Sequence, residues 1–330
     1  MTQSSTLAQS GPLRIIFMGT PEFACEPLKA LAEADGIEVN LVVTRPDAAS
    51  GRGKTLLPSP VKQVAQSYGL PILETASLKS DEIYLYLSEI PCDVMVVAAY
   101  GAIVPVRVIE LPRYDIINLH ASLLPKGRGA APMQQSLLHG EPKLGYSIMR
   151  IEEGLDSGPY CLQGSVEVGE RTYEEVSLEV SKAASKGMLE VLNIYAQGKT
   201  PEWIAQDDSQ ATFAPKLAKS DVLLDPSLDA NHNMCRIQAS SDAAPARCII
   251  CDKSLRVMKA HVISESEKNE MPFAMPKAGA VSIEQKKLLL GCESGSVLEV
   301  LELKPDGKRS MHSKEFIPGL KSQELIWKAC

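Results

Sequence analysis

Two polar side chains interrupt an apolar run in the middle of the chain: Asn118 and His120 stand two residues apart, shortly after Asp115. Residues two apart on a β-strand point to the same face, so this amide and imidazole would lie side by side at the end of a buried strand. An imidazole can take up and release protons near neutral pH. A lone histidine could instead be a satisfied core residue, but the pairing and the glycine-rich loop that follows favour a catalytic role.

A carboxylate that could act with this pair follows the next expected strand. Asp156 stands in the turn-forming segment 152–159. Loops that leave neighbouring strands can meet, and a carboxylate beside an imidazole orients the ring and stabilises its charged form. The alternative for Asp156 is an ordinary turn residue. The sequence thus predicts a general acid and base built from His120 and Asp156.

The elements that would position these residues alternate between strand and helix. Short apolar runs predict strands at 13–18, 37–44, 93–99, 115–120 and 144–151, with helical stretches between most of them. Continuous apolar strands separated by helices indicate a mostly parallel sheet covered on both faces, the doubly wound, Rossmann-like α/β architecture. Ligands of such folds bind beyond the carboxyl ends of the strands, where Asn118 and His120 are expected.

A different pattern follows a long amphipathic stretch. Residues 174–197 predict one helix, and the segment 198–201 ends it. Short strand-like runs at 246–250, 255–260, 279–283, 287–292 and 297–303 then indicate a small β-barrel. We therefore expect a disordered tail at 1–12, a catalytic domain at 13–199, a linker at 200–215 and a barrel domain at 216–330.

The composition is that of an ordinary soluble protein, with an apolar fraction of 45%. The first ten residues lack the basic start and apolar stretch of a leader or membrane span, so we expect no membrane association. The net charge of −7 argues against a nucleic-acid partner, but residues from 211 onward carry 17 basic and 15 acidic side chains. That local balance is compatible with a polyanion bound by the second domain.

The cysteines indicate a reducing compartment rather than a disulfide scaffold. Eight of them are scattered through a chain of 330 residues, so we expect a cytoplasmic protein. Cys248 and Cys251 have the spacing of a metal pair, but no second pair accompanies them. We expect buried thiols there and no metal site.

Two glycine-containing segments resemble nucleotide-binding motifs, but neither has all the glycines that its motif requires. Gly19-Thr20-Pro21 lacks the further glycines of a dinucleotide fingerprint, and the segment 51–55 lacks the opening glycine of a phosphate loop. A basic loop remains, from which Arg45, Arg52 and Lys54 could meet phosphate groups. A solvated loop is the alternative.

Six landmarks, in order along the chain, carry a resemblance to a known family. They are Gly19-Thr20-Pro21-Glu22-Phe23, Gly51-Arg52-Gly53-Lys54 with Pro58-Ser59-Pro60-Val61-Lys62, Val97-Ala98-Ala99-Tyr100-Gly101, Asn118 to Pro125, Arg128-Gly129-Ala130-Ala131-Pro132 and Gly154-Leu155-Asp156-Ser157-Gly158. Through them the sequence resembles the 10-formyltetrahydrofolate-dependent formyltransferases over roughly residues 13–330. The Asn, His and Asp set is shared by members that act on glycinamide ribonucleotide or amino sugars. The first landmarks, the basic loop and the expected barrel indicate the branch that formylates methionyl initiator tRNA.

The resemblance implies roles for the matching residues. Catalysis would be carried by Asn118, His120 and Asp156. Four residues would frame the folate pocket: Ser122, Leu123, Leu124 and Pro125. Three basic residues would contact the tRNA: Arg45, Arg52 and Lys54. The second domain would be an OB-like barrel that binds tRNA, and the working form would be a metal-free monomer with 10-formyltetrahydrofolate as co-substrate and initiator methionyl-tRNA as acceptor.

The expected reaction is direct attack of the amino group on the formyl carbon, with an oxyanion stabilised by Asn118 and His120 and with Asp156 orienting the imidazole. Two positions depart from the family's pattern: Ala121 stands where glycine is common, and no aromatic-proline run follows Arg236. The alternatives are transfer to a sugar-nucleotide amine, hydrolysis of the co-substrate to formate, and a binding module without activity. The intact Asn, His and Asp set disfavours the last of these.

Overall fold

Contacts between residues group the chain into two compact units that do not follow its order. The structure, a computed structural model, describes residues 11–50, 55–320 and 324–330. Unit 1 combines the chain up to Gly129 with Gly145–Val166 and Ser177–Phe213. Unit 2 combines Ala130–Leu144, Glu167–Val176 and Ala214–Cys330, so two short segments that precede residue 177 pack with the C-terminal part of the chain.

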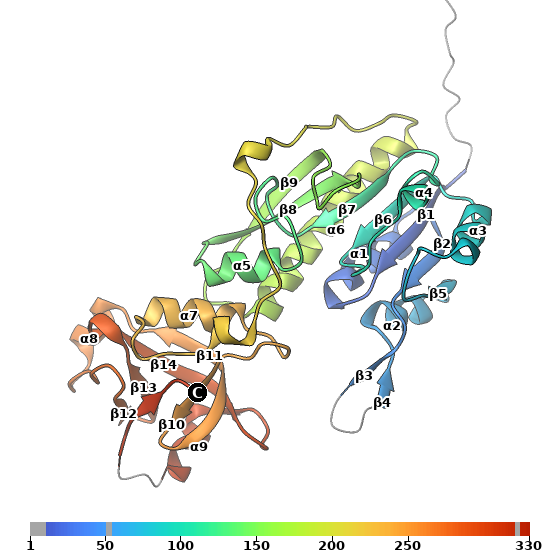
Figure 1. Ribbon diagram of the computed structural model, residues 1–330. Helices are drawn as coiled ribbons and strands as arrows, with labels where there is room; N and C mark the ends of the chain where they lie inside the picture. Colours follow the sequence, from blue (N-terminus) through green and yellow to red (C-terminus); the bar gives the residue numbers. More distant parts are fainter. Residues whose placement is uncertain (1–10, 51–54, 321–323) are drawn as a thin grey trace, which may run out of the picture. The chain divides into compact units, whose positions relative to one another are not determined.

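A seven-stranded sheet carries the fold of unit 1, in the order β5-β2-β1-β6-β7-β8-β9 (Figure 1). Its strands are β1 (Leu13–Gly19), β2 (Ile37–Thr44), β5 (Ile72–Glu74), β6 (Val94–Ala98), β7 (Ile116–His120), β8 (Lys143–Arg150) and β9 (Tyr160–Glu167). The strands from β5 to β7 are parallel, whereas β8 runs antiparallel to β7. The chain enters at β1 and extends first toward β5 and then toward β9, which confirms the doubly wound, mostly parallel sheet.

The predicted strands are all present, as β1, β2, β6, β7 and β8. The two edge strands lie outside the predicted set. β5 is only three residues long, and β9 places polar residues at half-buried positions. Neither strand therefore has the continuous apolar run that marks a buried strand in a sequence.

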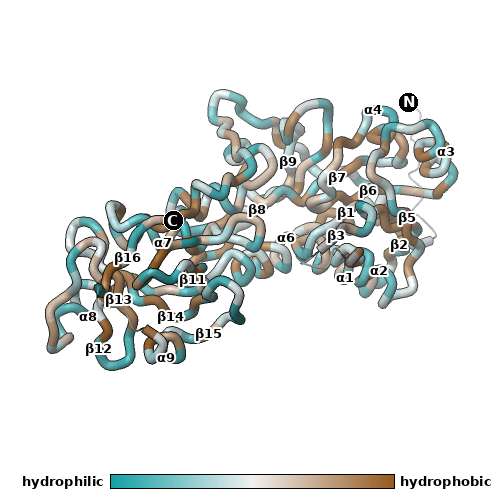
Figure 2. The backbone as a smooth tube through the Cα atoms, turned by 60° about the horizontal axis from the view of Figure 1, so that its bottom comes forward, coloured by the Kyte–Doolittle hydropathy of each residue, from teal (hydrophilic) through white to brown (hydrophobic). Residues whose placement is uncertain are grey.

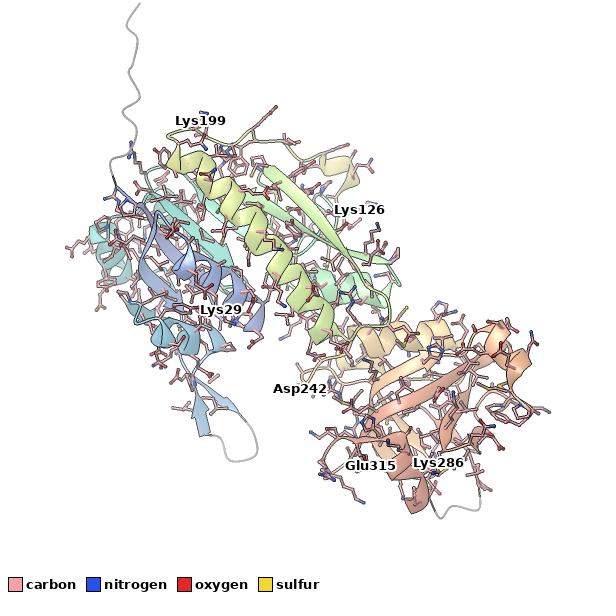
Figure 3. The ribbon with its side chains drawn as sticks, turned by 180° about the vertical axis from the view of Figure 1, so that it is seen from behind. Lys29, Lys126, Lys199, Asp242, Lys286 and Glu315 are labelled. Atoms are coloured by element: carbon pink, nitrogen blue, oxygen red, sulfur yellow. The ribbon has the colours of Figure 1, made fainter. Side chains whose placement is uncertain are left out.

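Helices cover both faces of this sheet. On one face, Ile16 and Met18 of β1 pack with residues of α3 (Asp81–Glu89) and α4 (Val106–Ile109). Residues of the opposite parity, such as Ile15 and Phe17, are also fully buried. α1 (Cys25–Glu33) and α2 (Pro60–Ser67) contact β2. The long helix α6 (Tyr173–Ala196) runs along the sheet and ends shortly before Lys199 (Figure 3), which confirms the helix predicted there.

The helix starts follow from local side-chain chemistry. The Ser59 hydroxyl accepts a hydrogen bond from the Lys62 N–H at 3.1 Å, and Pro60 opens α2. At α6, Thr172 and Glu175 form a reciprocal pair: the Thr172 N–H donates to the Glu175 carboxylate at 2.8 Å, and the Glu175 N–H donates to the Thr172 hydroxyl at 3.3 Å. These caps satisfy backbone donors that would otherwise lack partners.

Unit 2 is built on an antiparallel sheet that curves into a nearly closed barrel. Its main strands are β10 (Arg247–Ile250), β11 (Lys253–Val262), β12 (Val281–Glu284), β13 (Lys287–Gly291), β14 (Val297–Pro305) and β16 (Trp327–Lys328), and the short β15 (Met311–His312) pairs with β14. A bridge between Ala280 and Ile326 joins the two edges of the sheet. Trp327 is buried beside this seam, and its indole N–H donates to the Gly291 carbonyl at 2.8 Å. The predicted barrel is thus confirmed.

Short helices surround the barrel. α7 (Ala230–Ala239) contacts β11 and also α5 (Pro132–Leu138), which belongs to unit 2. α8 (Glu265–Glu270) and α9 (Ser313–Phe316) complete the unit. Figure 2 shows hydrophobic backbone stretches along central strands of each sheet, in agreement with a separate apolar core in each unit.

Two connecting segments of unit 1 form short pairings of their own. β3 (Ala48–Ser50) and β4 (Thr55–Leu57) form a small antiparallel ladder of their own. The stretch 204–213, within the expected linker, belongs to unit 1, where Ile204 and Tyr160 exchange backbone hydrogen bonds of 2.8 and 3.0 Å. Among the helices that the structure describes, none combines the length and the apolar character needed to cross a membrane.

Candidate active site

The strand β7 ends in the two polar residues that the sequence singles out. Asn118 and His120 lie on one face of β7, opposite Met149 and Ser147 of the antiparallel strand β8. His120 is buried, with 5% of its surface exposed, and Asn118 is half-buried. The strand therefore delivers both side chains to its carboxyl end, as predicted.

The ring of His120 is held on both sides by neighbouring loops. Its Nε2 atom lies 2.9 Å from the carbonyl oxygen of Gly127. A carbonyl only accepts, so this contact requires a proton on Nε2 and leaves Nδ1 as the basic nitrogen of the neutral ring. Nδ1 lies 3.7 Å from the Oδ2 atom of Asp156, which is ion-pair distance. When protonated, the imidazole thus has a carboxylate beside it.

Asp156 is fixed by its own loop. Its backbone has a φ of +48°, a left-handed conformation that aspartate tolerates better than most residues. The Gly129 N–H donates to Oδ2 at 2.8 Å. The structure therefore brings His120, at the end of β7, together with Asp156, in the loop after β8, as the sequence predicts.

Asn118 has unused hydrogen-bonding capacity. Its side chain makes no hydrogen bond to any residue that the structure describes. An amide in this position can donate to an oxygen of a bound molecule. The site thus combines a free donor, a base and a carboxylate, a set suited to reactions in which charge develops on a carbonyl oxygen.

The four residues expected to frame a folate pocket form a tight turn after β7. The Ser122 hydroxyl donates to the Lys126 carbonyl at 2.6 Å, and the Leu124 N–H donates to the Ser147 hydroxyl at 3.1 Å. Leu123 is 43% exposed, Pro125 is half-buried, and the exposed Lys126 follows (Figure 3). Leu123 is the member of this turn whose apolar side chain is open to a ligand.

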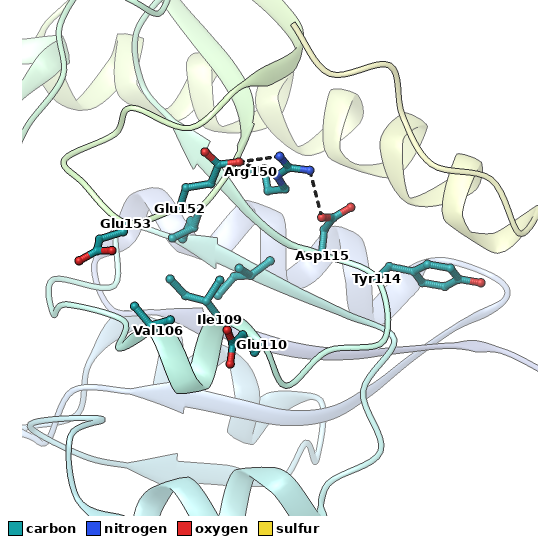
Figure 4. Close-up of a pocket in the computed structure, with 10 residues that line it drawn as sticks. Val106, Ile109, Glu110, Tyr114, Asp115, Arg150, Glu152 and Glu153 are labelled. Atoms are coloured by element: carbon teal, nitrogen blue, oxygen red, sulfur yellow. Dashed lines mark hydrogen bonds and ion pairs between the residues drawn. The ribbon is translucent and has the colours of Figure 1, made fainter. Parts of the chain in front are cut away.

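A cavity of about 300 Å³ lies at the other end of β7 (Figure 4). Arg150 stands in its wall between two acids, 2.5 Å from Glu152 and 3.8 Å from Asp115. The buried Tyr195 hydroxyl donates to Asp115 at 2.7 Å, and burial together with this bond raises the pKa of Tyr195. Neither His120 nor Asp156 lines this cavity. It shares with them the strand β7 and the first residues of the loop that carries Asp156.

The basic residues predicted to meet phosphate are described only in part. Arg45 follows β2 at the carboxyl edge of the sheet, where its guanidinium donates to the Ala76 carbonyl at 2.7 Å. Arg52 and Lys54 lie outside the described residues.

The cysteines behave as buried thiols where the sequence predicts it. Cys248 and Cys251 are both buried and unbonded to other sulfurs, and burial raises the pKa of each thiol. Over the described ranges, no group of three or more His, Cys, Asp or Glu side chains could hold a metal ion.

Sequence reasoning missed the residues that brace the two loops. Arg128 is buried and donates to Gln206 and Asp208, and Gln206 donates to the backbone of the Asp156 loop. Gln206 and Asp208 stand in a polar stretch without periodicity, a pattern that predicts only a linker between domains. Only Arg128, within a landmark that carries the family resemblance, gave a signal.

Two family models match most of the chain. One described as formyl transferase matches residues 13–192, and one described as formyl transferase, C-terminal domain, matches residues 216–321. The methionyl-tRNA formyltransferase of Methylococcus capsulatus is 39% identical over 306 residues, which are 92% of this chain and 96% of that protein. That of Acidobacterium capsulatum is 38% identical over 310 residues, 93% of this chain and 96% of that protein.

Solved structures share the fold at lower sequence identity. HypX from Aquifex aeolicus matches with a TM-score of 0.62 at 14% identity over 95% of this chain, which spans about half (51%) of that protein. The methionyl-tRNA formyltransferase from Clostridium thermocellum matches with a TM-score of 0.54 at 16% identity, over 76% of this chain and 93% of that one. From the family models and the near full-length sequence relatives together, the chain belongs to the formyl transferase family.

Proposed function

We propose that this chain transfers the formyl group of 10-formyltetrahydrofolate to the free amino group of methionyl initiator tRNA. The observation that carries the proposal is the 39% identity to a methionyl-tRNA formyltransferase over 92% of this chain and 96% of that protein. Because the match includes the second domain, both domains are expected to serve one reaction.

The chemistry needs no covalent intermediate on the protein. A free α-amine has a reference pKa of about 7.7–8.0 and is partly neutral near neutral pH, so it can attack directly. 10-Formyltetrahydrofolate supplies the activated formyl group. We propose that the Asn118 amide, which has no partner among the described residues, donates to the formyl oxygen as negative charge develops.

His120 and Asp156 are proposed to manage the proton that the amine releases. The Gly127 carbonyl keeps the proton on Nε2, so Nδ1 is the atom that accepts a proton. The resulting imidazolium lies 3.7 Å from the Asp156 carboxylate, which compensates its charge. As the intermediate collapses, the bond between the formyl carbon and N10 of the folate breaks, and the proton passes to N10, so that tetrahydrofolate leaves as a neutral amine. Proton management of this kind is commonly worth about 10²–10⁴ in rate.

Exposed apolar side chains follow the carboxyl ends of β6 and β7 and stand next to Asp156. Ile103 in the loop after β6 is 74% exposed, Leu123 after β7 is 43% exposed, and Leu155 beside Asp156 is 59% exposed. Large apolar side chains exposed on loops next to polar reacting groups are typical of a ligand site. We propose that these three, together with the turn formed by Ser122, Leu124 and Pro125, hold the co-substrate.

We propose that tRNA contacts involve both units. In unit 1 the candidates remain Arg45, Arg52 and Lys54. In the barrel, residues 216–330, several exposed basic side chains form no ion pair with described residues: Lys286, Lys304, Lys308, Arg309 and Lys314. Such side chains can meet phosphates, and binding through them would weaken as salt rises.

All three proposed catalytic residues come from one chain, so a monomer suffices for the reaction. The eight cysteines are free thiols, which suits the reducing cytoplasm. We therefore propose a cytoplasmic monomer as the working form.

The test is a formyl-transfer assay with the purified chain, 10-formyltetrahydrofolate labelled in the formyl group, and methionyl initiator tRNA. Label should appear on the methionine released from the tRNA by mild base, and uncharged tRNA serves as the control acceptor. Label transferred only to a sugar-nucleotide amine would overturn the proposal. Release of formate at the same rate without any acceptor would overturn it as well.

A further inference from the structure

The segment between the two family-model matches is hydrogen-bonded to the loop that carries Asp156. This segment, 193–215, contains Gln206. The Gln206 side-chain N–H₂ donates to the carbonyl of Asp156 at 2.8 Å and to the carbonyl of Gly158 at 2.6 Å. Its own carbonyl oxygen accepts from Nε of Arg128 at 3.0 Å. Both ends of the amide are therefore engaged.

The same segment also holds the loop that orients His120. Arg128 is 7% exposed at its side chain and forms an ion pair of 2.7 Å with Asp208. Thr212 accepts two backbone hydrogen bonds of 2.9 Å, from Gly127 at its hydroxyl and from Arg128 at its carbonyl. The carbonyl of that same Gly127 is the one that lies against Nε2 of His120. One stretch of chain thus contacts both loops of the proposed site.

The conformation of Asp156 makes the Gln206 contact consequential. A residue with φ of +48° occupies a sparsely populated region, which persists only where surrounding contacts fix it. Gln206 bonds the carbonyl of Asp156 itself and that of Gly158 two residues on. Without these bonds the loop can relax, and the carboxylate then moves relative to the imidazole.

We infer that Gln206, in the segment that connects the two matched domains, is a positioning residue for formyl transfer, which acts through Asp156. The inference rests on the proposed function, because it takes Asp156 as the counter-charge of His120. The side-chain hydrogen bonds of Gln206 go to Arg128 and to the backbone carbonyls of Asp156 and Gly158, and not to His120 or the Asp156 carboxylate. Its effect should therefore vanish once that carboxylate is removed.

A double-mutant cycle in formyl transfer tests this dependence. Gln206→Ala should lower kcat by up to about 100-fold, the scale on which a misplacement of about 1 Å acts, with little change in KM for either substrate. In an Asp156→Asn background the same substitution should lower kcat less than about 2-fold, because its target is already lost. Gln210→Ala is the matched control, since Gln210 lies exposed in the same segment and should change nothing.

A second variant covers the case in which Gln206→Ala fails to fold. Arg128→Lys keeps a positive charge near Asp208 but removes the Nε–H that holds Gln206, and it should give a smaller loss with the same dependence on Asp156. Equal fold losses in both backgrounds would overturn the inference, because they would mean a role in folding alone. A wild-type chain that does not formylate methionyl-tRNA would instead refute the proposed function itself, and this inference with it.

Discussion

The Gly129 N–H donates a hydrogen bond of 2.8 Å to Oδ2 of Asp156, the same oxygen that lies 3.7 Å from Nδ1 of His120. The carboxylate is thus held by the loop that follows the histidine, and not by the histidine alone. The position of the Asp156 carboxylate therefore depends on the surrounding backbone as well as on His120. One mutation can change the charge of Asp156, and a different mutation can change its position.

Asp156→Asn tests the charge. The amide oxygen can still accept from Gly129, so the loop keeps its shape, but the imidazolium loses its counter-charge. We expect kcat for formyl transfer to fall by about 10²–10⁴, with the dissociation constant for the folate nearly unchanged. Asp35→Asn, at an exposed position, is the control. Turnover close to that of the wild type would remove Asp156 from the mechanism.

Gly158→Ala tests the placement. A Cβ at Gly158 would lie 2.0 Å from the Arg150 carbonyl oxygen, so the chain must shift there. We expect the free energy of unfolding to fall by about 1–3 kcal/mol, as for other overpacked sites, and kcat to fall with it. The comparison is Gly11→Ala, where no heavy atom lies within 4 Å of the added methyl. Thermal melts and turnover assays of both variants measure these effects. Equal Tm and equal kcat for Gly158→Ala and Gly11→Ala would mean that the loop accommodates the methyl group without cost.

The barrel unit carries a pH-dependent contact at His261. Its ring nitrogens lie 2.6 Å from Glu170 and 3.0 Å from Glu267. Burial lowers the pKa of His261, but the hydrogen bonds to the two carboxylates outweigh it and raise the pKa above its usual value. The contribution to stability is therefore complete below the unfolded pKa of about 6.5 and is lost as pH rises through the folded value.

His261→Gln measures this contribution. The difference in Tm between the wild type and the variant should be largest near about pH 5.5 and should shrink by about pH 9. Gln keeps a polar side chain but cannot titrate. A difference that stays constant across this range would mean that the proton on His261 is not involved.

Arg52→Ala tests the basic loop. If Arg52 meets a phosphate of the acceptor, the apparent affinity for methionyl-tRNA should fall, and the slope of log affinity against log salt should flatten by about one unit. Lys186→Ala, an exposed position on α6, removes the same charge elsewhere. Identical salt slopes for the two variants would mean that Arg52 contacts no phosphate and is an ordinary solvated loop residue.

Much of the fold could be predicted because its strands are buried on both faces. Val94–Ala98 and Ile116–His120 are nearly continuous apolar runs. Short runs of this kind between helices are typical of parallel strands that are buried on both faces, so these strands are recognisable in the sequence. The pair Asn118 and His120 could be found because two polar residues interrupt such a run on one face. The edge strand β9 and its half-buried polar residues gave no comparable pattern.

The hydrogen bonds that hold the two loops of the site could not be predicted from the spacing of residues in the sequence. Gln206 acts on residues 48 and 50 positions earlier, and Arg128 reaches residues 78 and 80 positions later. Contacts over such separations depend on how the loops return to the sheet, which no local periodicity encodes. A polar linker and a polar segment that supports an active site have similar compositions, so composition does not distinguish them.

The bonds from Gln206 and Thr212 have a practical consequence for anyone who wishes to dissect this protein. A boundary drawn at the end of the first family-model match, residue 192, would discard both side chains and leave the sheet intact. The resulting fragment could be well folded by every spectroscopic criterion and still be a poor catalyst. An isolated version of this half of the molecule should extend at least through Phe213.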